Sequence, residues 1–202
     1  MRIPLLLQRQ IAEPFGILGK LVSAAAAANT TPDVQATVAR LRVERDHRVL
    51  DIGFGAGVSL DLLLGAAPEG RVAGVDTSEE QVQAARTLHE ALVESGRLDL
   101  RVGRGEELPW MGGSFDGVMT VHTLEFVPKP LALVREMRRV LRPGGRAVFG
   151  LWAPDVMRKA GFSAPPCNLL DGDDVVAMAI EVGMRDAKVE KSGRGTYVVA
   201  RV

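Results

Sequence analysis

Three glycines follow a β-like run in the stretch Asp51-Ile52-Gly53-Phe54-Gly55-Ala56-Gly57. Glycine suits such a place because a Cβ would clash in the tight turn or hold the backbone away from a ligand. A plain tight turn is the alternative for this loop alone. A second acidic residue, Asp76, ends the next β-like run, where a carboxylate can accept hydrogen bonds from both hydroxyls of a ribose. Together the loop and Asp76 predict a site for a nucleoside-bearing ligand.

The spacing inside the glycine run distinguishes between two such ligands. A dinucleotide fingerprint requires G-x-G-x-x-G/A, but counting from Gly53 and Gly55 the last position is Val58. Asp51 would repel a pyrophosphate, whereas it suits a ligand with an ammonium and a sulfonium. A P-loop is excluded because no Gly-Lys-Ser/Thr follows. The pattern therefore favours S-adenosylmethionine over a nicotinamide dinucleotide.

Short β-like runs alternate with helical stretches around these residues, which is typical of parallel strands joined by crossover helices. The expected strands are Arg48–Ile52, Arg71–Val75, Leu98–Val102, Phe115–Val121, Arg146–Leu151, Asp186–Glu190 and Thr196–Arg201. The connector between the last two is short enough only for an antiparallel hairpin. We therefore expect an α/β, Rossmann-like doubly wound fold: a mostly parallel seven-stranded sheet with one antiparallel strand at or near the edge and helices on both faces.

Helix boundaries are marked by capping residues and glycines. The first helix is expected over about Val58–Leu64, stopped by Gly65, and a second opens at Ser78 with a capping box to Gln81 and ends near Gly96. Two later helices are expected over Pro130–Leu141 and from a cap at Asp171 to Gly183. These helices supply the covers that a parallel sheet requires.

Five ordered motifs resemble class I S-adenosylmethionine-dependent methyltransferases. The residues Val49 to Gly57 look like the first motif of that family and Gly74-Val75-Asp76-Thr77-Ser78 like the second. The segments Glu106-Glu107-Leu108-Pro109-Trp110, Ser114-Phe115-Asp116-Gly117-Val118 and Leu141-Arg142-Pro143-Gly144-Gly145-Arg146 resemble the small-molecule branch that includes ubiquinone- and menaquinone-biosynthesis methyltransferases. The resemblance covers about residues 45–151.

The resemblance implies roles for single residues at the cofactor. Gly53 and Gly55 would let the backbone approach the methionine part, and Asp51 would hold its amino group through water. Asp76 would accept from the ribose hydroxyls, Thr77 would lie beside the adenine, and Gly105-Glu106 would close over the adenine edge. The candidate cofactor-binding residues are Asp51, Gly53, Phe54, Gly55, Gly57, Asp76, Thr77, Gly105, Glu106 and Thr120.

One position departs from the pattern of the branch that the sequence resembles. Arg104 stands where an aspartate is usual, and an arginine cannot accept from the adenine amino group. That contact is then either lost or made by Glu106.

The expected reaction is an in-line methyl transfer to a small, rather apolar acceptor, for which the protein supplies alignment and desolvation. For a hydroxyl or enol acceptor, His122 or Glu125 is the nearest candidate base. Two other functions stay open: a noncatalytic cofactor-binding subunit and, disfavoured by Val58 and by the absence of a Tyr-x-x-x-Lys pair, an NAD-linked oxidoreductase.

Composition bounds the partners and the compartment. The 202 residues carry 25 basic and 25 acidic side chains, so no global field favours nucleic acid or an anionic membrane. The single cysteine, Cys167, excludes an intramolecular disulfide and a cysteine-rich zinc site and fits the cytoplasm. No metal site and no stable membrane insertion are expected, and the protein is expected as a monomer or homodimer.

The domain prediction divides one structural domain into two parts. Residues 1–47 are expected to form a helical lid or cover segment, and residues 48–202 the S-adenosylmethionine-binding core. Within the first part, Pro4 to Thr31 carries many apolar residues and the stretch Phe15-Gly16-Ile17-Leu18-Gly19, which favours a lid over the acceptor site.

Overall fold

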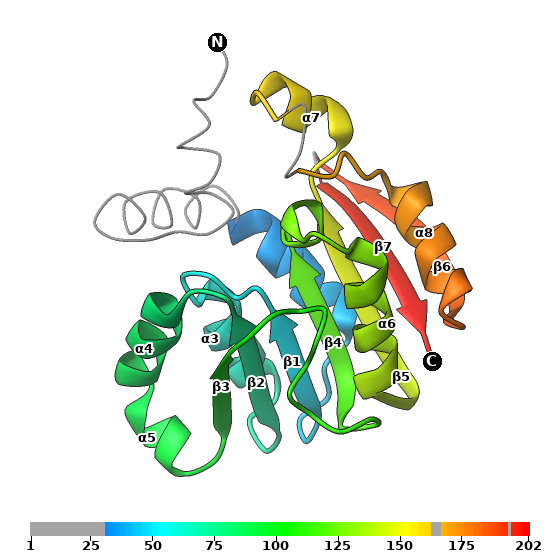
Figure 1. Ribbon diagram of the computed structural model, residues 1–202. Helices are drawn as coiled ribbons and strands as arrows, with labels where there is room; N and C mark the ends of the chain where they lie inside the picture. The colour runs from blue at the N-terminus through cyan, green and yellow to red at the C-terminus, as the bar shows by residue number, and fades with distance from the viewer. Residues whose placement is uncertain (1–30, 163–166, 194) are drawn as a thin grey trace.

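The computed structural model describes residues 31–162, 167–193 and 195–202. A single sheet of seven strands runs through these residues, with helices in a layer on each side (Figure 1). The spatial strand order is β3-β2-β1-β4-β5-β7-β6, so the chain starts in the middle of the sheet and winds outward in both directions.

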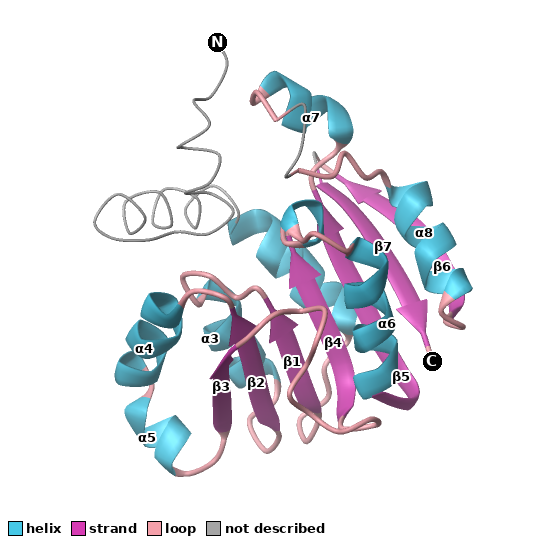
Figure 2. Ribbon diagram, in the orientation of Figure 1, coloured by secondary structure: helices cyan, strands magenta, loops and turns pink. Residues whose placement is uncertain are grey.

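The strands run parallel except next to one edge (Figure 2). They comprise β1 (Arg48–Ile52), β2 (Arg71–Asp76), β3 (Leu98–Val102), β4 (Phe115–Val121), β5 (Leu141–Leu151), β6 (Arg185–Ser192) and β7 (Gly195–Arg201). β7 is antiparallel to both neighbours, β5 and β6, and is the single reversed strand. The predicted fold class is therefore confirmed, including the hairpin at the edge.

Two hydrophobic clusters fill the two faces of the sheet. One contains Leu50 and Ile52 of β1 and packs against α6 (Pro130–Val140) and α8 (Gly172–Glu181). The other contains Val49 of β1 and packs against α3 (Val58–Ala66) and α4 (Glu79–Leu88). Because successive strand residues point to opposite faces, a β1 that is apolar at neighbouring positions serves both clusters.

The predicted helix caps are present. The side chain of Ser78 accepts from the backbone N–H of Gln81 at 3.3 Å. Asp171 accepts from the N–H groups of Asp173 and Asp174, while the Asp174 carboxylate accepts from the Asp171 N–H, a complete capping box. Such caps satisfy N–H groups that would otherwise lack partners at a helix start.

Several boundaries differ from the sequence-based expectation; β2, β6 and β7, for example, extend one or two residues further at an end than predicted. The second helix is interrupted at His89, so that α4 is followed by a separate α5 (Glu90–Glu94). α3 continues through Gly65 to Ala66, because glycine permits a helix end without forcing one. β5 begins at Leu141 instead of Arg146, because Leu141 pairs with Phe115 before a register shift.

Residues 31–41 form a helix that packs against the sheet. A Cβ at Gly117 would lie 3.0 Å from Leu41, and one at Gly150 would lie 2.8 Å from Thr37 Oγ1, so this helix lies directly on β4 and β5. The predicted lid over Pro4 to Thr31 falls outside the described residues except for Thr31. Among the described residues, no helix combines the length and apolarity needed to cross a membrane.

Candidate active site

The glycine loop after β1 is built on three left-handed backbone positions, with φ of 77° at Gly53, 52° at Gly55 and 83° at Gly57. L-residues with a Cβ rarely adopt such angles, which explains the three glycines. The Gly53 N–H donates to the Val75 carbonyl at 2.8 Å, and the Gly55 N–H donates to Asp76 Oδ2 at 2.8 Å. Gly57 caps the start of α3. The loop is thus held against the end of β2.

Two carboxylates lie at this loop in surroundings that disfavour their charge. Burial raises the pKa of Asp51 to about 7, with a further rise from the charge of Asp76, although Ser59 donates a hydrogen bond to it. Burial also raises the pKa of Asp76, against the backbone N–H groups of Ser78 and Gly55 that it accepts from. Two desolvated acids side by side suit a cationic ligand, since a positive charge would restore their ionised forms. The residues therefore fit the ammonium, sulfonium and ribose of S-adenosylmethionine.

Two predicted cofactor residues stand behind the loop. Phe54 is buried, and a Cβ at Gly74 would lie 2.8 Å from its ring, so it packs over β2. Thr120 has no exposed surface, and its hydroxyl donates to the Ile52 carbonyl at 3.0 Å. Thr120 thus holds the end of β1 in place, and its hydroxyl is already occupied.

The predicted adenine side lies after β3. Thr77 is exposed, and Gly105 is buried where a Cβ would come within 2.6 Å of Leu133. Glu106 is only 14% exposed and lies 3.8 Å from the guanidinium of Arg104, which is 56% exposed. Glu106 is therefore placed inward and the arginine outward, which is compatible with Glu106 as the adenine partner.

His122 follows β4 in a left-handed conformation (φ 51°), with its side chain 7% exposed. Its Nε2 lies 3.0 Å from Asp33 Oδ2, and its Nδ1 lies 3.7 Å from Glu125 Oε1. Burial lowers the pKa of His122, but the two carboxylates outweigh that effect and leave the pKa above its usual value. The imidazole consequently favours its protonated form.

Asp33 and Glu125 are themselves held by further groups. Tyr197 donates its hydroxyl to Asp33 Oδ1 at 2.8 Å, while burial and this hydrogen bond raise the pKa of Tyr197 to about 12. The hydrogen bond to His122 keeps the pKa of Asp33 below its usual value. Glu125, fully buried, accepts from the Trp152 N–H at 2.7 Å. The predicted pair His122 and Glu125 thus lies within a series of polar contacts that runs from Tyr197 through Asp33 and His122 to Glu125.

Asp33 and Tyr197 were not among the predicted site residues. They lie 89 and 164 residues from their respective partners, His122 and Asp33, along the chain, and no local motif marks them. The one hint was that Tyr197 is the only tyrosine, near the start of a strand that begins beside the carboxyl end of β5.

An aromatic cluster covers the same edge of the sheet. The ring of Trp152, just after β5, lies 4.7 Å from that of His122 and 6.2 Å from those of Phe126 and Phe162. Phe126 belongs to the 3₁₀ helix η1 (Leu124–Phe126), and α7 (Pro154–Lys159) follows Trp152. The carboxyl ends of β4 and β5 therefore face an apolar, aromatic surface.

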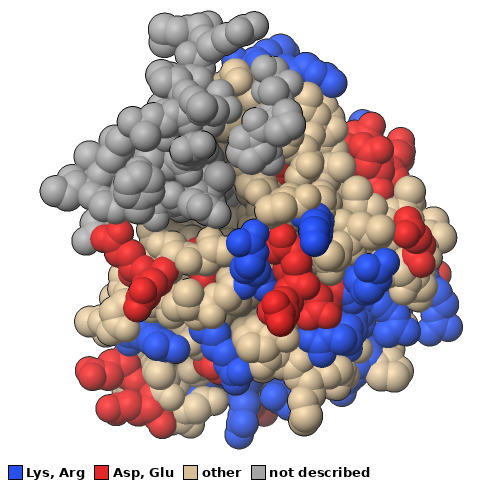
Figure 3. All heavy atoms as spheres, in the orientation of Figure 1, with Lys and Arg blue, Asp and Glu red and all other residues tan. Residues whose placement is uncertain are grey.

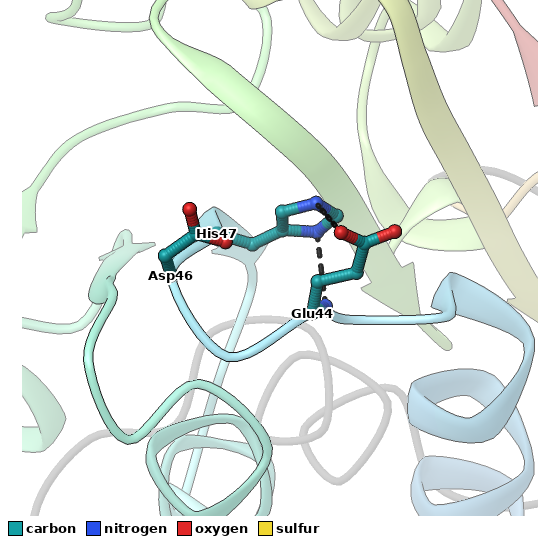
Figure 4. Close-up of side chains that lie close together, drawn as sticks. All are labelled: Glu44, Asp46 and His47. Atoms are coloured by element: carbon teal, nitrogen blue, oxygen red, sulfur yellow. Dashed lines mark hydrogen bonds and ion pairs between the residues drawn. The ribbon is translucent and has the colours of Figure 1, made fainter.

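A separate group of possible metal ligands lies in the loop before β1. Ligand atoms of Glu44, Asp46 and His47 lie within 4.8 Å of one another, and Figure 4 shows the Glu44 carboxylate turned toward the His47 ring. His47 Nδ1 already accepts from the Glu44 backbone N–H at 3.1 Å. Both acids are exposed, and these contacts close the loop on itself.

Residues 50–149 match a family model described as a methyltransferase domain, which spans β1 to β5 and every predicted cofactor residue. The chain belongs to the class I methyltransferases. S-adenosylmethionine is accordingly the cofactor of this methyltransferase, in agreement with the two desolvated carboxylates at the glycine loop.

Similar proteins agree with this assignment. A ubiquinone biosynthesis O-methyltransferase of Xanthomonas oryzae is 41% identical over 102 residues, which are 49% of this chain and 40% of that one. The O-methyltransferase rstn1 of Aspergillus nomiae is 27% identical and covers 72% of this chain and 68% of its own. A methyltransferase of Haloferax volcanii, solved with the Trm112 methyltransferase activator, has a TM-score of 0.77 at 18% identity. The match covers 89% of this chain and 92% of that one. The methyltransferase thus spans less than half of the Xanthomonas relative.

Proposed function

We propose that this methyltransferase transfers the methyl group of S-adenosylmethionine to a small, rather apolar acceptor by in-line displacement. The observation that carries the proposal is the hydrogen bond from the Gly55 N–H to Asp76. It holds a desolvated carboxylate beside Gly55, where no Cβ keeps a ligand from the backbone, and the buried Asp51 lies behind it. S-adenosylmethionine supplies an electrophilic methyl group on a sulfonium when bound.

The residues of the loop and the end of β2 hold and orient the cofactor in this proposal. Asp51 offers a carboxylate to the ammonium, and Asp76 accepts from the ribose hydroxyls with the lone pairs that the Gly55 and Ser78 N–H groups leave free. Glu106 accepts from the adenine amino group in place of the missing aspartate, and Thr77 lies alongside. Orientation of this kind accounts for much of the rate in a bimolecular displacement.

The acceptor is placed at the carboxyl ends of β4 and β5. In an open α/β sheet the ligand crevice lies at this edge, and here Trp152 and Phe126, both partly exposed, supply aromatic surface over the buried ring of Phe162. Two relatives carry the name O-methyltransferase, which favours a hydroxyl acceptor. An aromatic surface with a hydroxyl acceptor points to a small apolar alcohol or phenol.

His122 and Glu125 are placed beside the acceptor as positioning residues. Nε2 of His122 is engaged by Asp33, and the raised pKa of His122 favours the imidazolium form, which has no lone pair to accept a proton. Glu125 has no exposed surface and accepts a hydrogen bond from the backbone N–H of Trp152. We propose that Glu125 holds the backbone of Trp152 and His122 packs against its ring, and that the imidazole stabilises the oxygen of an acceptor whose proton has already passed to solvent.

Binding of S-adenosylhomocysteine tests the cofactor site. At about 100 times its dissociation constant it should stabilise the fold by roughly 2.7 kcal/mol, and Asp76→Ala should weaken binding by about 1.5–3 kcal/mol, or roughly 10- to 150-fold. The control is Asp173→Ala, an exposed acid in the first turn of α8. No thermal shift at millimolar ligand would overturn the proposal.

Two other outcomes identify the alternatives. Binding of S-adenosylhomocysteine without turnover over a broad acceptor panel would indicate a noncatalytic cofactor-binding subunit. A thermal shift with NAD but none with S-adenosylhomocysteine would indicate an oxidoreductase. The cytoplasm remains the proposed location, since the buried thiol of Cys167, with its pKa raised by burial, suits a reducing compartment.

A further inference from the structure

A cavity lies at the β3 edge of the sheet, near the amino ends of β1 to β3, with residues of α4 and α5 in its wall. It encloses about 530 Å³, a volume within the range of small-molecule sites. Arg48 and Arg71, the exposed first residues of β1 and β2, line it, whereas the glycine loop and Asp76 lie at the opposite ends of the same strands. This arginine cavity is therefore separate from the methyl-transfer edge.

The charged residues of the arginine cavity have an excess of positive charge. They are Arg48, Arg71, Arg86, Arg101 and Asp99. Four cations against one acid stand out in a chain with equal numbers of basic and acidic residues. Figure 3 shows basic side chains over this lower part of the sheet.

Two of these arginines are already satisfied within the protein. Arg101 binds the Asp99 carboxylate with two nitrogens and donates to the Pro109 carbonyl at 2.7 Å. Arg86 donates to the Leu100 carbonyl at 2.5 Å. Both arginines therefore contribute positive charge to the wall of the cavity, but their N–H donors are largely used within the protein.

Arg48 and Arg71 differ from the other two. They are register partners on adjacent parallel strands, so their side chains leave the same face of the sheet next to each other. Within the described part of the chain, neither guanidinium forms an ion pair with a carboxylate. Like charges in such register cost stability unless an anion lies between them.

The remaining walls of the arginine cavity are largely apolar. Trp110 and Phe115 meet edge to face with ring centroids 5.6 Å apart, and Ala73 and Leu100 also line the cavity. The connection from β3 to β4 contains no helix, so this stretch of sheet is covered by the loop that carries Trp110. A ring and an anionic group can thus be accommodated together.

We propose that the arginine cavity binds a phosphate monoester attached to a small ring, with Arg48 and Arg71 as the phosphate ligands. Two guanidinium groups match the double negative charge and offer planar pairs of N–H donors to its oxygens. The phosphate relieves the repulsion between the two register partners, and the ring packs beside Trp110. The site does not depend on the methyl-transfer function.

Phenyl phosphate is the probe, titrated into the full chain by calorimetry with S-adenosylhomocysteine present at saturation and at constant ionic strength in chloride. We expect saturable binding, no comparable binding of phenol, and at least tenfold weaker binding in Arg48→Gln and Arg71→Gln. Arg158→Gln, an exposed residue of α7, is the matched control and should bind as the wild type does. S-adenosylhomocysteine affinity should stay unchanged in all three variants, which shows that they fold.

A second measurement uses the register pair directly. In chloride alone, Arg71→Gln should melt no lower than the wild type, because it removes one of two adjacent like charges. Phenyl phosphate should raise the melting temperature of the wild type and of Arg158→Gln but not that of Arg71→Gln. The proposal is overturned if phenyl phosphate does not bind the wild type at millimolar concentration. It is also overturned if phenol binds as tightly as phenyl phosphate, or if Arg48→Gln and Arg71→Gln bind phenyl phosphate as tightly as the wild type does.

Discussion

Asp51 is a carboxyl group whose surroundings oppose its charge. It is fully buried, and its pKa lies at about 7 because burial and the neighbouring Asp76 both favour the protonated form. Only the Ser59 hydrogen bond acts in the other direction. The residue that would bind the cofactor ammonium is thus half protonated near neutral pH in the ligand-free protein.

Cofactor affinity should therefore depend on pH. Since the ammonium prefers ionised Asp51, S-adenosylhomocysteine should bind about tenfold more weakly at pH 6 than on the plateau above pH 7. Asp51→Asn should bind weakly at every pH without this slope. Calorimetric titrations between pH 5.5 and 7.5 measure the effect, with Asp173→Asn as a control that keeps the wild-type slope. A flat wild-type profile would contradict a contact between Asp51 and the ammonium.

His122 depends on Asp33, an acid in the helix of residues 31–41 that Tyr197 also contacts. The hydrogen bond to Asp33 helps hold the pKa of His122 above its usual value, so Asp33→Asn should lower that pKa and cost about 1–3 kcal/mol of stability. Tyr197→Phe removes only the hydroxyl donor to Asp33 and should leave the pKa of His122 raised. An NMR titration of the imidazole follows both. An unchanged pKa in Asp33→Asn would mean that Glu125 alone sets it.

At the scale of elements, Gly53 in the loop from β1 to α3 and Gly96 in the turn before β3 are both left-handed, but the space around them differs. A Cβ at Gly53 would lie 2.2 Å from Thr123 Oγ1, in a residue with φ of 77°. A Cβ at Gly96, with φ of 70°, would meet no atom within 4 Å. The two positions therefore share the backbone cost of a left-handed residue and differ in the clash.

Alanine at these two positions separates the effects. Gly96→Ala should cost about 1–2 kcal/mol of stability with cofactor affinity intact. Gly53→Ala should cost more and should also weaken S-adenosylhomocysteine binding, because Thr123 or the loop has to move. Urea denaturation and calorimetry measure the two quantities. Equal losses of stability in both variants would show that Thr123 yields at no cost.

On the scale of the whole molecule, the raised pKa of Asp51 links stability to pH. The folded protein keeps a proton up to about pH 7 that the unfolded chain releases near pH 3.8, so ligand-free stability falls as pH rises through this window. The effect is about 1.4 kcal/mol per pH unit. His122 acts in the same direction, since stability from its raised pKa is complete below 6.5 and is lost as pH rises through the folded value.

The variant Asp51→Asn isolates the first contribution. Relative to the wild type, it should gain stability steadily from about pH 4 to 7 in the absence of ligand, while losing cofactor affinity. Urea denaturation at pH 5 and pH 8 measures the difference between the two proteins. A constant difference would place the pKa of Asp51 outside this window.

Much of the fold and the cofactor loop followed from local sequence. The predicted bounds of β1, β3 and β4 match the structure residue for residue, because each is a short run whose pattern and flanking turns are complete within the segment. Gly53, Gly55 and Gly57 likewise indicated a tight turn, and all three have the positive φ angles that glycine favours. The caps at Ser78 and Asp171 involve partners within three residues, so they too are legible in the chain.

Only the tertiary structure brought together the groups that are distant in the chain. Asp33 reaches His122 and Tyr197 because a helix lies across β4 and β5, and the close approach depends on Gly117 and Gly150. The pKa of Asp51 depends on burial and on a second acid from another strand, and the pair Arg48 and Arg71 depends on strand register. Burial, register and helix docking are properties of long-range packing, which local residue patterns do not encode.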